Sequence, residues 1–458
     1  MITIVIGPRL ELVAGPNCSQ PGPPELPIRL ERQFISENTF ANPKRETLRR
    51  LGKWTGNEPV TIVLWTRRHG ELILPRGYLP TLIRSLKDEA VVHTVEDCTV
   101  CPPAEALEVE GHLYQYQDRA LADLLRWPTG ILEAPTGSGK TNIMLSAVAR
   151  LGTPALICVH TTELLNQTCD RVRSWLGVEP GVIAGNKAKL QPVTVGMIQT
   201  LARRDLKAEG IAGYFGAVLI DEAHHAPAMT WARILEQMPA RYKYGLTATA
   251  WRKDGMQFLM WRLIGNKSAK ISRSEVQSVG NIIWPQIETV PTDYYFDLSD
   301  SSEWGAMLSD LITNSCRNRL IVRELRSRIN GSKALILTDR IEHANILAGA
   351  LQDMQPVLLT GEMGKVERAQ AMLRVRHGAA LTIATTHLLG EGVDVPGWDL
   401  LFLVSPIAGG PRTLQAIGRV ARPAPGKTRA TVVDFVDTRV DALRAAAHSR
   451  QRLYGGAA

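Results

Sequence analysis

Short apolar runs alternate with longer helical stretches from residue 111 onward, and this alternation constrains the fold more than any other feature of the sequence. Apolar runs of this length, buried on both faces and spaced by helices, favour parallel sheets built from βαβ units. Two successive series of runs predict two α/β domains, divided near residues 270–290. The first series is residues 130–133, 155–159, 192–195, 217–220 and 244–247, and the second is 334–337, 357–359, 381–384, 400–404 and 431–435.

Length and composition are those of an intracellular globular protein. The chain has 458 residues, with 45% apolar and 21% charged side chains, which suits about two to four domains. Six cysteines, scattered except for Cys98 and Cys101, favour a reducing compartment. Residues 1–7 are apolar but too short for a secretory signal, and no run approaches the roughly 18 apolar residues that span a bilayer. We expect a soluble cytoplasmic protein with no membrane partner.

Charge is distributed unevenly along the chain. Lys and Arg exceed Asp and Glu by 53 to 45, and the net charge of +8 suggests an anionic partner. Residues 24–87 hold 12 basic and 6 acidic side chains, whereas residues 88–110 hold 7 acidic and no basic ones. The acidic stretch is typical of a linker. We therefore predict a small α+β domain at residues 1–100, followed by α/β domains at residues 101–275 and 276–458.

A glycine-rich loop, residues 134–141, follows a candidate strand and opens an apolar helical pattern. In a nucleoside triphosphatase, Gly137 and Gly139 would let backbone N–H groups approach the phosphates. Lys140 would reach the β and γ phosphates, and the Thr141 hydroxyl would ligate Mg²⁺. The alternative is a chance glycine-rich turn. The predicted phosphate-binding residues are Pro135, Thr136, Gly137, Ser138, Gly139, Lys140 and Thr141.

Two carboxylates, Asp221 and Glu222, directly follow the candidate strand at residues 217–220. Ligands of open α/β sheets gather at the carboxyl ends of the strands. Asp221 is therefore predicted to hold Mg²⁺, and Glu222 to polarise the attacking water as a general base. Alone, such a pair is more often a solvated helix start, where carboxylates favour the dipole. A zinc site at the adjacent His224 and His225 is not expected, because their side chains point apart.

Taken together, these motifs resemble those of superfamily 2 helicases, the DEAD/DEAH-type motors with two RecA-like domains, over residues 111–435. Gln117 resembles the glutamine that reads adenine in this family, and Ala134, where the strict loop pattern has Gly, is a helicase variant. Residues 246–255 resemble the coupling motif, with Ala250 in place of the usual Pro. The resemblance implies two tandem RecA-like domains of the P-loop class, with ATP as substrate and Mg²⁺ as cofactor.

Residues 385–396 resemble the helicase motif that touches both nucleic acid and nucleotide, with Gly392 and Asp394 as candidate nucleotide contacts. Residues 159–164 and 195–201 resemble the two strand-contacting motifs. Hydroxyl and amide side chains in these motifs suit phosphate contacts, which position nucleic acid without reading its sequence. Each is by itself more often a cap or loop residue. The candidates are Thr161, Thr162, Gln199, Thr200 and Thr385.

Residues 415–422 resemble the arginine-finger motif, which makes Gln415, Arg419 and Arg422 candidate catalytic residues. The two arginines are three residues apart, a spacing that places them on one face of a helix. They would stabilise charge on the transferring γ-phosphoryl group. An isolated pair of this kind would more often bind surface carboxylates. The resemblance implies that neither motor domain alone carries a complete site, so hydrolysis would require domain closure.

Residues 113–117, 247–255, 317–318 and 391–396 are most similar to the XPB-like branch, which includes phage helicases of the UvsW type. This resemblance implies DNA rather than RNA as the partner. We predict a monomeric ATP-dependent DNA helicase that unwinds or branch-migrates forked or branched DNA in replication, recombination or repair, with single-stranded DNA in the motor cleft. A duplex-DNA translocase, a nucleotide-gated DNA-binding scaffold and an RNA helicase remain alternatives.

The N-terminal domain is predicted to assist DNA binding, because its basic side chains are interleaved with tryptophans that could stack on bases. The alternative is a solvated face over core tryptophans. Residues 60–65 and 71–74 predict a hairpin with a basic tip at residues 66–70. Cys98 and Cys101 form a single CxxC, a weak zinc pattern. The interleaved residues are Arg49, Arg50, Lys53, Trp54, Trp65, Arg67, Arg68 and Arg76.

Overall fold

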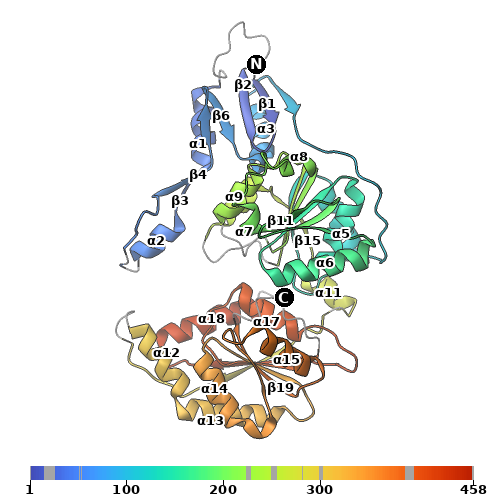
Figure 1. Cartoon of the computed structure of the whole chain (residues 1–458). Coiled ribbons are helices and arrows are strands. Elements are labelled where there is room, and N and C mark those ends of the chain that lie inside the picture. Colours follow the sequence, from blue (N-terminus) through green and yellow to red (C-terminus); the bar gives the residue numbers. More distant parts are fainter. Residues whose placement is uncertain are drawn as a thin grey trace. The chain divides into compact units, whose positions relative to one another are not determined.

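The computed structural model describes residues 2–14, 26–50, 52, 54–222, 228–248, 255–280, 282–298, 303–386 and 397–455. The chain forms two compact units, with the main boundary between Ile271 and Ser272 (Figure 1). A five-stranded and an eight-stranded sheet organise the first unit, and a six-stranded sheet organises the second. Among the described helices, none has the length and apolarity that crossing a membrane requires.

The N-terminal sheet packs one apolar face against two helices. Its strand order is β5-β6-β2-β1-β7, with β1 antiparallel to β2 and parallel to β7. Alternate residues such as Ile2 and Ile4 point into a core with Phe34 and Leu82 of the helices, as the period of two in a strand requires. The elements are β1 (Ile2–Ile6), β2 (Leu10–Ala14), β5 (Thr66–Arg68), β6 (Glu71–Leu74), β7 (His93–Asp97), α1 (Ile28–Glu37) and α3 (Leu79–Asp88).

Two local expectations for this domain are wrong. The hairpin partner of β6 is β5, so the turn is His69-Gly70, with φ of 50° and 86°, which suits a two-residue hairpin. Residues 61–63 instead form β4 (Thr61–Val63), which pairs with β3 (Thr39–Ala41). The expected linker contains β7, a polar edge strand that its composition did not reveal.

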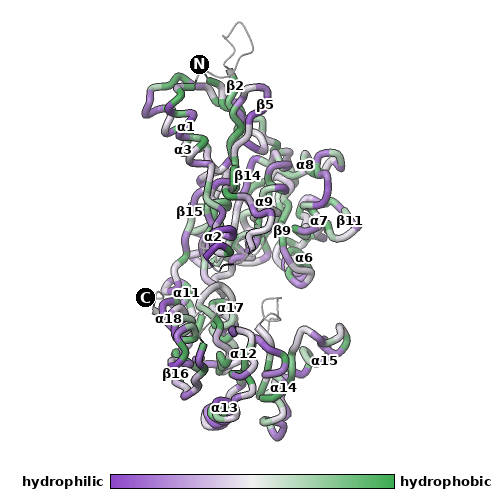
Figure 2. Tube along the Cα trace, turned by 90° about the vertical axis from the view of Figure 1, so that its left-hand side faces the viewer, coloured by the Kyte–Doolittle hydropathy of each residue, from purple (hydrophilic) through white to green (hydrophobic). Residues whose placement is uncertain are grey.

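Helix α2 (Pro43–Arg50) follows β3 and has no buried residue. Figure 2 shows hydrophilic colouring along this helix. Trp54, just beyond it, is 86% exposed. Strands β3 and β4 are thus linked by a segment that contains a basic helix without buried residues and an exposed tryptophan.

The eight-stranded sheet is parallel except for the pair β10–β11, and its order is β11-β10-β12-β9-β13-β14-β8-β15. Every apolar run predicted in this half is a strand, and β9 and β13 are buried along their whole length. The strands are β8 (Thr129–Glu133), β9 (Ala155–Val159), β10 (Gly181–Ala184), β11 (Lys187–Lys189), β12 (Val193–Met197), β13 (Ala217–Ile220), β14 (Tyr242–Thr247) and β15 (Lys267–Lys270).

Helices cover both faces of this sheet (Figure 1), which explains why its central strands are apolar throughout rather than alternating. The helices are α4 (Gln115–Leu125), α5 (Lys140–Leu151), α6 (Thr162–Leu176), α7 (Ile198–Leu201), α8 (Ile211–Tyr214), α9 (Ala228–Leu235) and α10 (Gln257–Leu263).

The second unit repeats this plan with six parallel strands in the order β16-β21-β20-β17-β19-β18. Ala334 and Ile336 of β17 pack with α13 and α14, whereas the alternate Leu335 and Leu337 pack with α15 and α17. The α/β fold with two tandem parallel-sheet domains is therefore confirmed. The elements are β16 (Gln286–Pro291), β17 (Ala334–Thr338), β18 (Val357–Leu359), β19 (Leu381–Thr385), β20 (Leu400–Leu403), β21 (Thr431–Val436), α11 (Arg273–Ser278), α12 (Trp304–Thr313), α13 (Ser315–Arg328), α14 (Ile341–Ala350), α15 (Lys365–Arg376), α17 (Pro411–Val420) and α18 (Asp441–Gly455).

Candidate nucleotide and nucleic-acid site

The glycine-rich loop joins β8 to α5 at the carboxyl edge of the eight-stranded sheet. Ala134 N donates to Thr247 O at the end of β14, at 2.9 Å. Gly137 and Gly139 have φ of 85° and 78°, a backbone region that side chains disfavour. Because α5 begins at the next residue, Lys140, the loop places backbone N–H groups at a helix N-terminus, which is a ready anion site.

Lys140, Asp221 and Glu222 meet at this edge. Lys140 Nζ lies 3.6 Å from Glu222 Oε1 and donates to Ala134 O at 3.2 Å. Asp221 follows β13, and its backbone N donates to Cys158 O at 3.1 Å. Both Lys140 and Asp221 are buried. Burial and the adjacent Glu222 raise the pKa of Asp221, and Lys140 lowers it.

Glu222 has φ of 49°, an unusual backbone conformation for a residue with a side chain. Its own N–H donates to Asp221 Oδ1 at 3.0 Å. Non-glycine residues in this region are strained by about 1–3 kcal/mol and cluster at functional sites. The turn therefore fixes two neighbouring carboxylates beside one ammonium group.

This donor set fits Mg²⁺ that arrives with nucleotide phosphates. Mg²⁺ takes oxygen ligands and is usually held by one or two carboxylates together with phosphates. Asp221 supplies a carboxylate, and Thr141 supplies a hydroxyl at the second position of α5. A cation there would relieve the repulsion between Asp221 and Glu222, which is otherwise costly.

Gln117 lies against the phosphate loop. Its side-chain oxygen accepts from Tyr114 N at 2.9 Å, closing a capping box at the start of α4. A Cβ added to Gly139 would lie 2.3 Å from Gln117 Nε2. The predicted adenine-reading residue and the loop are therefore neighbours, although they are far apart in sequence.

The first-domain candidates for nucleic-acid contact take part in local hydrogen bonds. Thr161 caps α6 by accepting from Leu164 N at 3.2 Å, and Thr162 is the first residue of that helix. Gln199 Nε2 donates to His160 O at 2.9 Å, and Thr200 Oγ1 accepts from Gly185 N at 3.0 Å. A hydroxyl that accepts a bond still has its own proton to donate, so the threonines could serve both roles.

The second-domain candidates are only partly described. Thr385 is buried at the end of β19. Gly392 and Asp394 lie outside the described residues, as does the side chain of Gln415. Arg419 is in α17, but this helix ends at Val420, so Arg422 lies beyond it and the expectation of one helical face is wrong.

Lys427 is a residue that the sequence analysis missed. Its Nζ donates to Val420 O, to Arg422 O at 3.1 Å and to Trp398 O at 2.6 Å. Burial lowers its pKa to about 8. A cation at a helix C-terminus binds the last carbonyls and favours the dipole, so Lys427 holds the segment that carries Arg419 and Arg422. A lysine after a helix is too common a signal to have revealed this.

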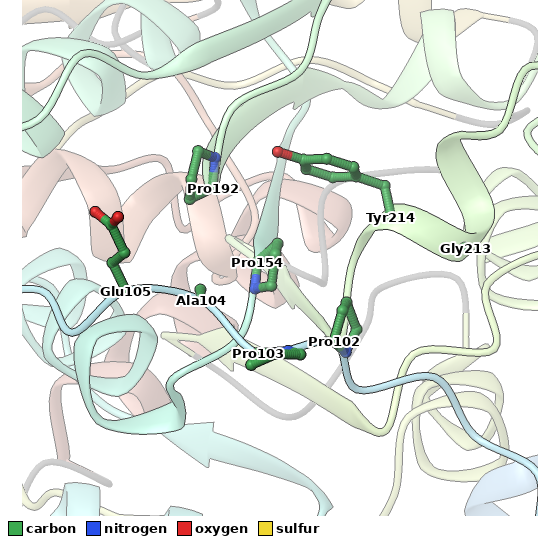
Figure 3. A pocket seen from close by; sticks show the side chains of 8 residues that line it. All are labelled: Pro102, Pro103, Ala104, Glu105, Pro154, Pro192, Gly213 and Tyr214. Carbon is green, nitrogen blue, oxygen red and sulfur yellow. The ribbon is translucent and has the colours of Figure 1, made fainter.

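A cavity of about 530 Å³ lies elsewhere in the first unit (Figure 3). Pro154 and Pro192 precede β9 and β12, so the cavity is at the amino ends of the strands, opposite the phosphate loop. Cys98 and Cys101 are exposed and not bonded to each other, and the described residues contain no cluster of three metal-ligating side chains. The cavity lining is Pro102, Pro103, Ala104, Glu105, Pro154, Pro192, Gly213 and Tyr214.

Comparisons with known proteins identify both motor domains. The family described as type III restriction enzyme, res subunit, matches residues 110–252, and the helicase conserved C-terminal domain matches residues 316–424. Probable helicase D10 of Escherichia phage T5 is 28% identical over 315 residues, which cover 67% of this chain and 68% of that protein. DNA 3'-5' translocase XPB2 of Sulfurisphaera tokodaii is 25% identical over 360 residues, 70% of this chain and 81% of that one. The chain is a superfamily 2 helicase of the XPB-like branch.

The fold of this helicase agrees with that of a solved superfamily member. The structure of Saccharomyces cerevisiae Dbp5 bound to RNA and ADP BeF3 covers 74% of the chain, with 87% of its own length aligned, at a TM-score of 0.53 and 18% identity. This likeness supports the RecA-like architecture. As a helicase of this superfamily, the protein is an ATP hydrolase.

Proposed function

We propose that the helicase couples hydrolysis of Mg²⁺-bound ATP to movement along DNA, and that it unwinds or branch-migrates forked or branched DNA in replication, recombination or repair. The observation that carries this proposal is the meeting of Lys140, Asp221 and Glu222 beside the phosphate loop. It combines a phosphate-binding ammonium group with two carboxylates of different roles. The protein is proposed to act as a monomer.

Each residue at this edge has a distinct proposed role. The N–H groups of the loop and Lys140 bind the phosphates, and Thr141 and Asp221 hold Mg²⁺, which neutralises phosphate charge. Glu222 orients the attacking water and accepts its proton. The second domain would supply Gly392, Asp394 and Gln415 as further nucleotide contacts, and Arg419 and Arg422 as stabilisers of charge on the γ-phosphoryl group.

Replacing Glu222 with Gln tests the hydrolytic role. The variant keeps the shape of the side chain but loses the base, so the turnover number should fall by at least about 100-fold. ATP affinity, measured by titration with a fluorescent nucleotide, should change little. Unchanged phosphate release would instead favour the scaffold alternative, in which nucleotide binding gates DNA binding without turnover.

The choice of DNA rests on relatives rather than on geometry. The relative from Sulfurisphaera tokodaii is named a DNA translocase, whereas the fold is shared with an RNA-bound protein. Comparing ATPase stimulation by RNA, single-stranded DNA, duplex DNA and forked DNA decides between them. Forked DNA should stimulate most, and stimulation by RNA alone would refute the proposal. The name of that relative also keeps open the translocase alternative, for which duplex DNA would stimulate hydrolysis without strand displacement.

The basic arm of the N-terminal domain, defined as residues 43–54, supports binding to a fork. Arg49 and Arg50 are exposed on α2, and Trp54 is the most exposed large apolar side chain among the described residues. Other members of the predicted patch have structural roles, because Trp65 Nε1 donates to Thr39 Oγ1 at 2.9 Å and Arg76 is buried. Lys53 lies outside the described residues, and Arg67 pairs with Glu31.

Replacing Trp54 with Ala should weaken binding to forked DNA roughly fivefold or more, since stacking on an aromatic side chain contributes about 1–3 kcal/mol per base. The matched control is Trp127→Ala, because Trp127 is also exposed, at 60%, but lies outside the arm. Fluorescence anisotropy with a labelled fork measures both. Equal affinity of wild type and both variants would argue that the arm does not stack on DNA.

A further inference from the structure

The N-terminal domain touches the first motor domain through a buried arginine and a close backbone approach. Arg76, in the 3-10 turn η1 (Arg76–Tyr78), is 5% exposed and donates to Ala240 O and, at 2.6 Å, to Arg241 O. A Cβ added to Gly77 would lie 2.3 Å from Trp261 O, at the backbone of α10. No side chain fits there, so this contact depends on glycine.

A buried lysine, whose pKa burial lowers well below its ordinary value, joins the domains from the opposite direction. Lys243, in β14, is 1% exposed and donates to Pro8 O of the N-terminal domain at 3.1 Å, and to Leu235 O at 2.9 Å. Arg9, next to Pro8, lies 3.4 Å from Glu236. Polar groups buried in this way need their acceptors, because a buried hydrogen-bond donor without a partner is strongly unfavourable.

Helix α10 is held by aromatic and hydrogen-bonded contacts to the same domain. Arg262 Nη2 donates to Glu37 O at 3.1 Å, and its guanidinium group lies 4.6 Å from the centre of the Tyr78 ring. The rings of Phe40 and Phe258 stack with their centres 3.9 Å apart. Such pairs add to the stabilisation from apolar burial.

Apolar packing makes the interface continuous with the motor core. Ile62 and Leu64, on and beside β4, belong to one buried cluster with Leu235, Met260 and Leu263 of α9 and α10. The N-terminal domain is therefore built onto the first motor domain and is not a tethered accessory.

Strand β14 and helix α10, which the N-terminal domain contacts, flank the segment that resembles the coupling motif. Strand β14 carries Lys243 and ends at Thr247, whose O accepts from Ala134 N of the phosphate loop. Helix α10 begins at Gln257. Residues 246–255, which join them, are the segment similar to the coupling motif, and residues 249–254 lie outside the described residues.

We infer that the N-terminal domain is a positioning element of the motor, which holds β14 and α10 at a fixed spacing so that changes at the phosphate loop reach the coupling segment instead of being lost in movement of its flanks. This inference rests on the proposed function. Arg76, Lys243, Arg262 and Phe40 are its positioning residues, and all four lie outside the phosphate loop and the acidic pair. The inference gives the domain a role in coupling that is separate from DNA binding by the basic arm.

Two variants test this role, Phe40→Ala and Arg262→Gln, with Arg84→Ala as the matched control on the exposed side of α3. In both interface variants, unstimulated ATP hydrolysis and the KM for ATP should stay within twofold of wild type. Stimulation by forked DNA, and the base pairs separated per ATP hydrolysed, should each fall at least fivefold. Phe40→Tyr keeps a ring at this position and should restore wild-type values.

Two results would overturn the inference. The first is that stimulation of hydrolysis by forked DNA, and the base pairs separated per ATP, stay within twofold of wild type in the folded interface variants. Alternatively, stimulated and unstimulated turnover could fall by the same factor, which would show that the interface only stabilises the fold. A wild-type protein that hydrolyses ATP without any stimulation by nucleic acid would refute the proposed function before the variants are compared.

Cross-linking covers the case in which an interface variant does not fold. Phe40→Cys and Phe258→Cys are joined by a short bis-maleimide after Cys18, Cys98, Cys101 and Cys316 are replaced by Ser. Because the two cysteines remove the stacked rings, stimulation of hydrolysis by forked DNA should be reduced before the linker is added, and the linker should restore it. Wild-type stimulation before the linker is added, or reduced stimulation that the linker does not restore, would contradict the inference.

Discussion

The carboxyl edges of the two motor sheets differ in how their buried charged groups are paired. At the first edge, Asp221 and Glu222 are adjacent carboxylates with Lys140 near them, and burial together with Glu222 raises the pKa of Asp221. At the second edge, Arg317 donates to both oxygens of Asp437, at 2.8 and 3.1 Å, and both side chains are buried. The first edge holds two adjacent carboxyl groups beside one lysine, whereas the second pairs one carboxylate with one guanidinium group.

The second edge extends into a buried polar network. Arg317 also donates to Val404 O at 2.7 Å. His343 Nδ1 lies 3.0 Å from Thr338 Oγ1, and its Nε2 lies 3.0 Å from Asn318 Oδ1. Arg317 Nη1 is buried without a hydrogen-bond partner, but the other hydrogen bonds of the network fix its side chains, and buried networks of this kind make a region rigid and specific. The comparison indicates that the first edge is unfavourable until a ligand relieves it, whereas the second is a rigid frame for the strand ends.

The largest effect on this comparison should come from Asp437→Asn. Breaking a buried ion pair from one side leaves Arg317 charged and poorly paired, which costs about 3–5 kcal/mol. Because the chain has two units, unfolding should be followed locally, by hydrogen exchange of β21 amides in urea. The matched control is Asp293→Asn, whose partner Arg439 forms an exposed pair, and it should change little. A variant as stable as wild type would show that the pair does not stabilise the frame.

A smaller change in the stability of the second motor domain is expected when the pH is lowered, because of His343. Burial, and then the charge of Arg317, lower the pKa of His343 to about 3 from 6.5. The unfolded chain therefore binds more protons between these values, so stability present above pH 6.5 is lost as the pH falls through this window. By about pH 5.5, wild type should lose about 1.4 kcal/mol that His343→Gln does not lose. Hydrogen exchange of β17 measures the difference, and His377→Gln, at an exposed position, is the control. Parallel pH profiles for wild type and His343→Gln would contradict the prediction.

The smallest expected change in stability comes from Asp221, and it has the opposite pH dependence to that of His343. The pKa of Asp221 is raised in the folded protein, so its ionisation destabilises the fold as the pH rises above 3.8, the value of an unperturbed carboxyl. Asp221→Asn should therefore stabilise the first motor domain by about 1 kcal/mol at pH 8 while abolishing hydrolysis, as expected of a site that trades stability for function. Hydrogen exchange of β13 amides measures the gain. If Asp221→Asn were less stable than wild type, the first edge would not be unfavourable in the absence of a ligand, and this difference between the two edges would be refuted.

The sequence predicted the interior of each motor sheet and missed its edges. Every predicted apolar run is a strand, because a strand buried on both faces must be apolar at each position. The strands β10, β11, β15 and β16 were not predicted. All four lie at or near sheet edges. Strands β11, β15 and β16 carry exposed polar residues such as Lys187, Lys267 and Gln286, so their sequences lack a continuous apolar run. Strand β10 is an apolar run of four residues that the sequence analysis missed.

The sequence predicted those parts of the candidate site in which a recognisable motif directly follows a parallel strand. A phosphate loop and an acidic pair that both follow parallel strands must reach the same sheet edge, so the proximity of Lys140 to Glu222 followed from topology. The role of Lys427 at the end of α17 did not, and neither did the end of that helix before Arg422. Both depend on which carbonyls lie within reach after folding.

The sequence by itself determined the two tandem α/β domains, the phosphate loop and the order of the helicase motifs, because these depend on local periodicity and on residue types at fixed spacing. Tertiary structure alone decided where each charge lies. Arg76 was one of several basic residues in an N-terminal patch, yet it is buried against Ala240 and Arg241, whereas Arg49 remains exposed. The physical reason is that burial depends on partners more than 160 residues away, and no local pattern encodes such a contact.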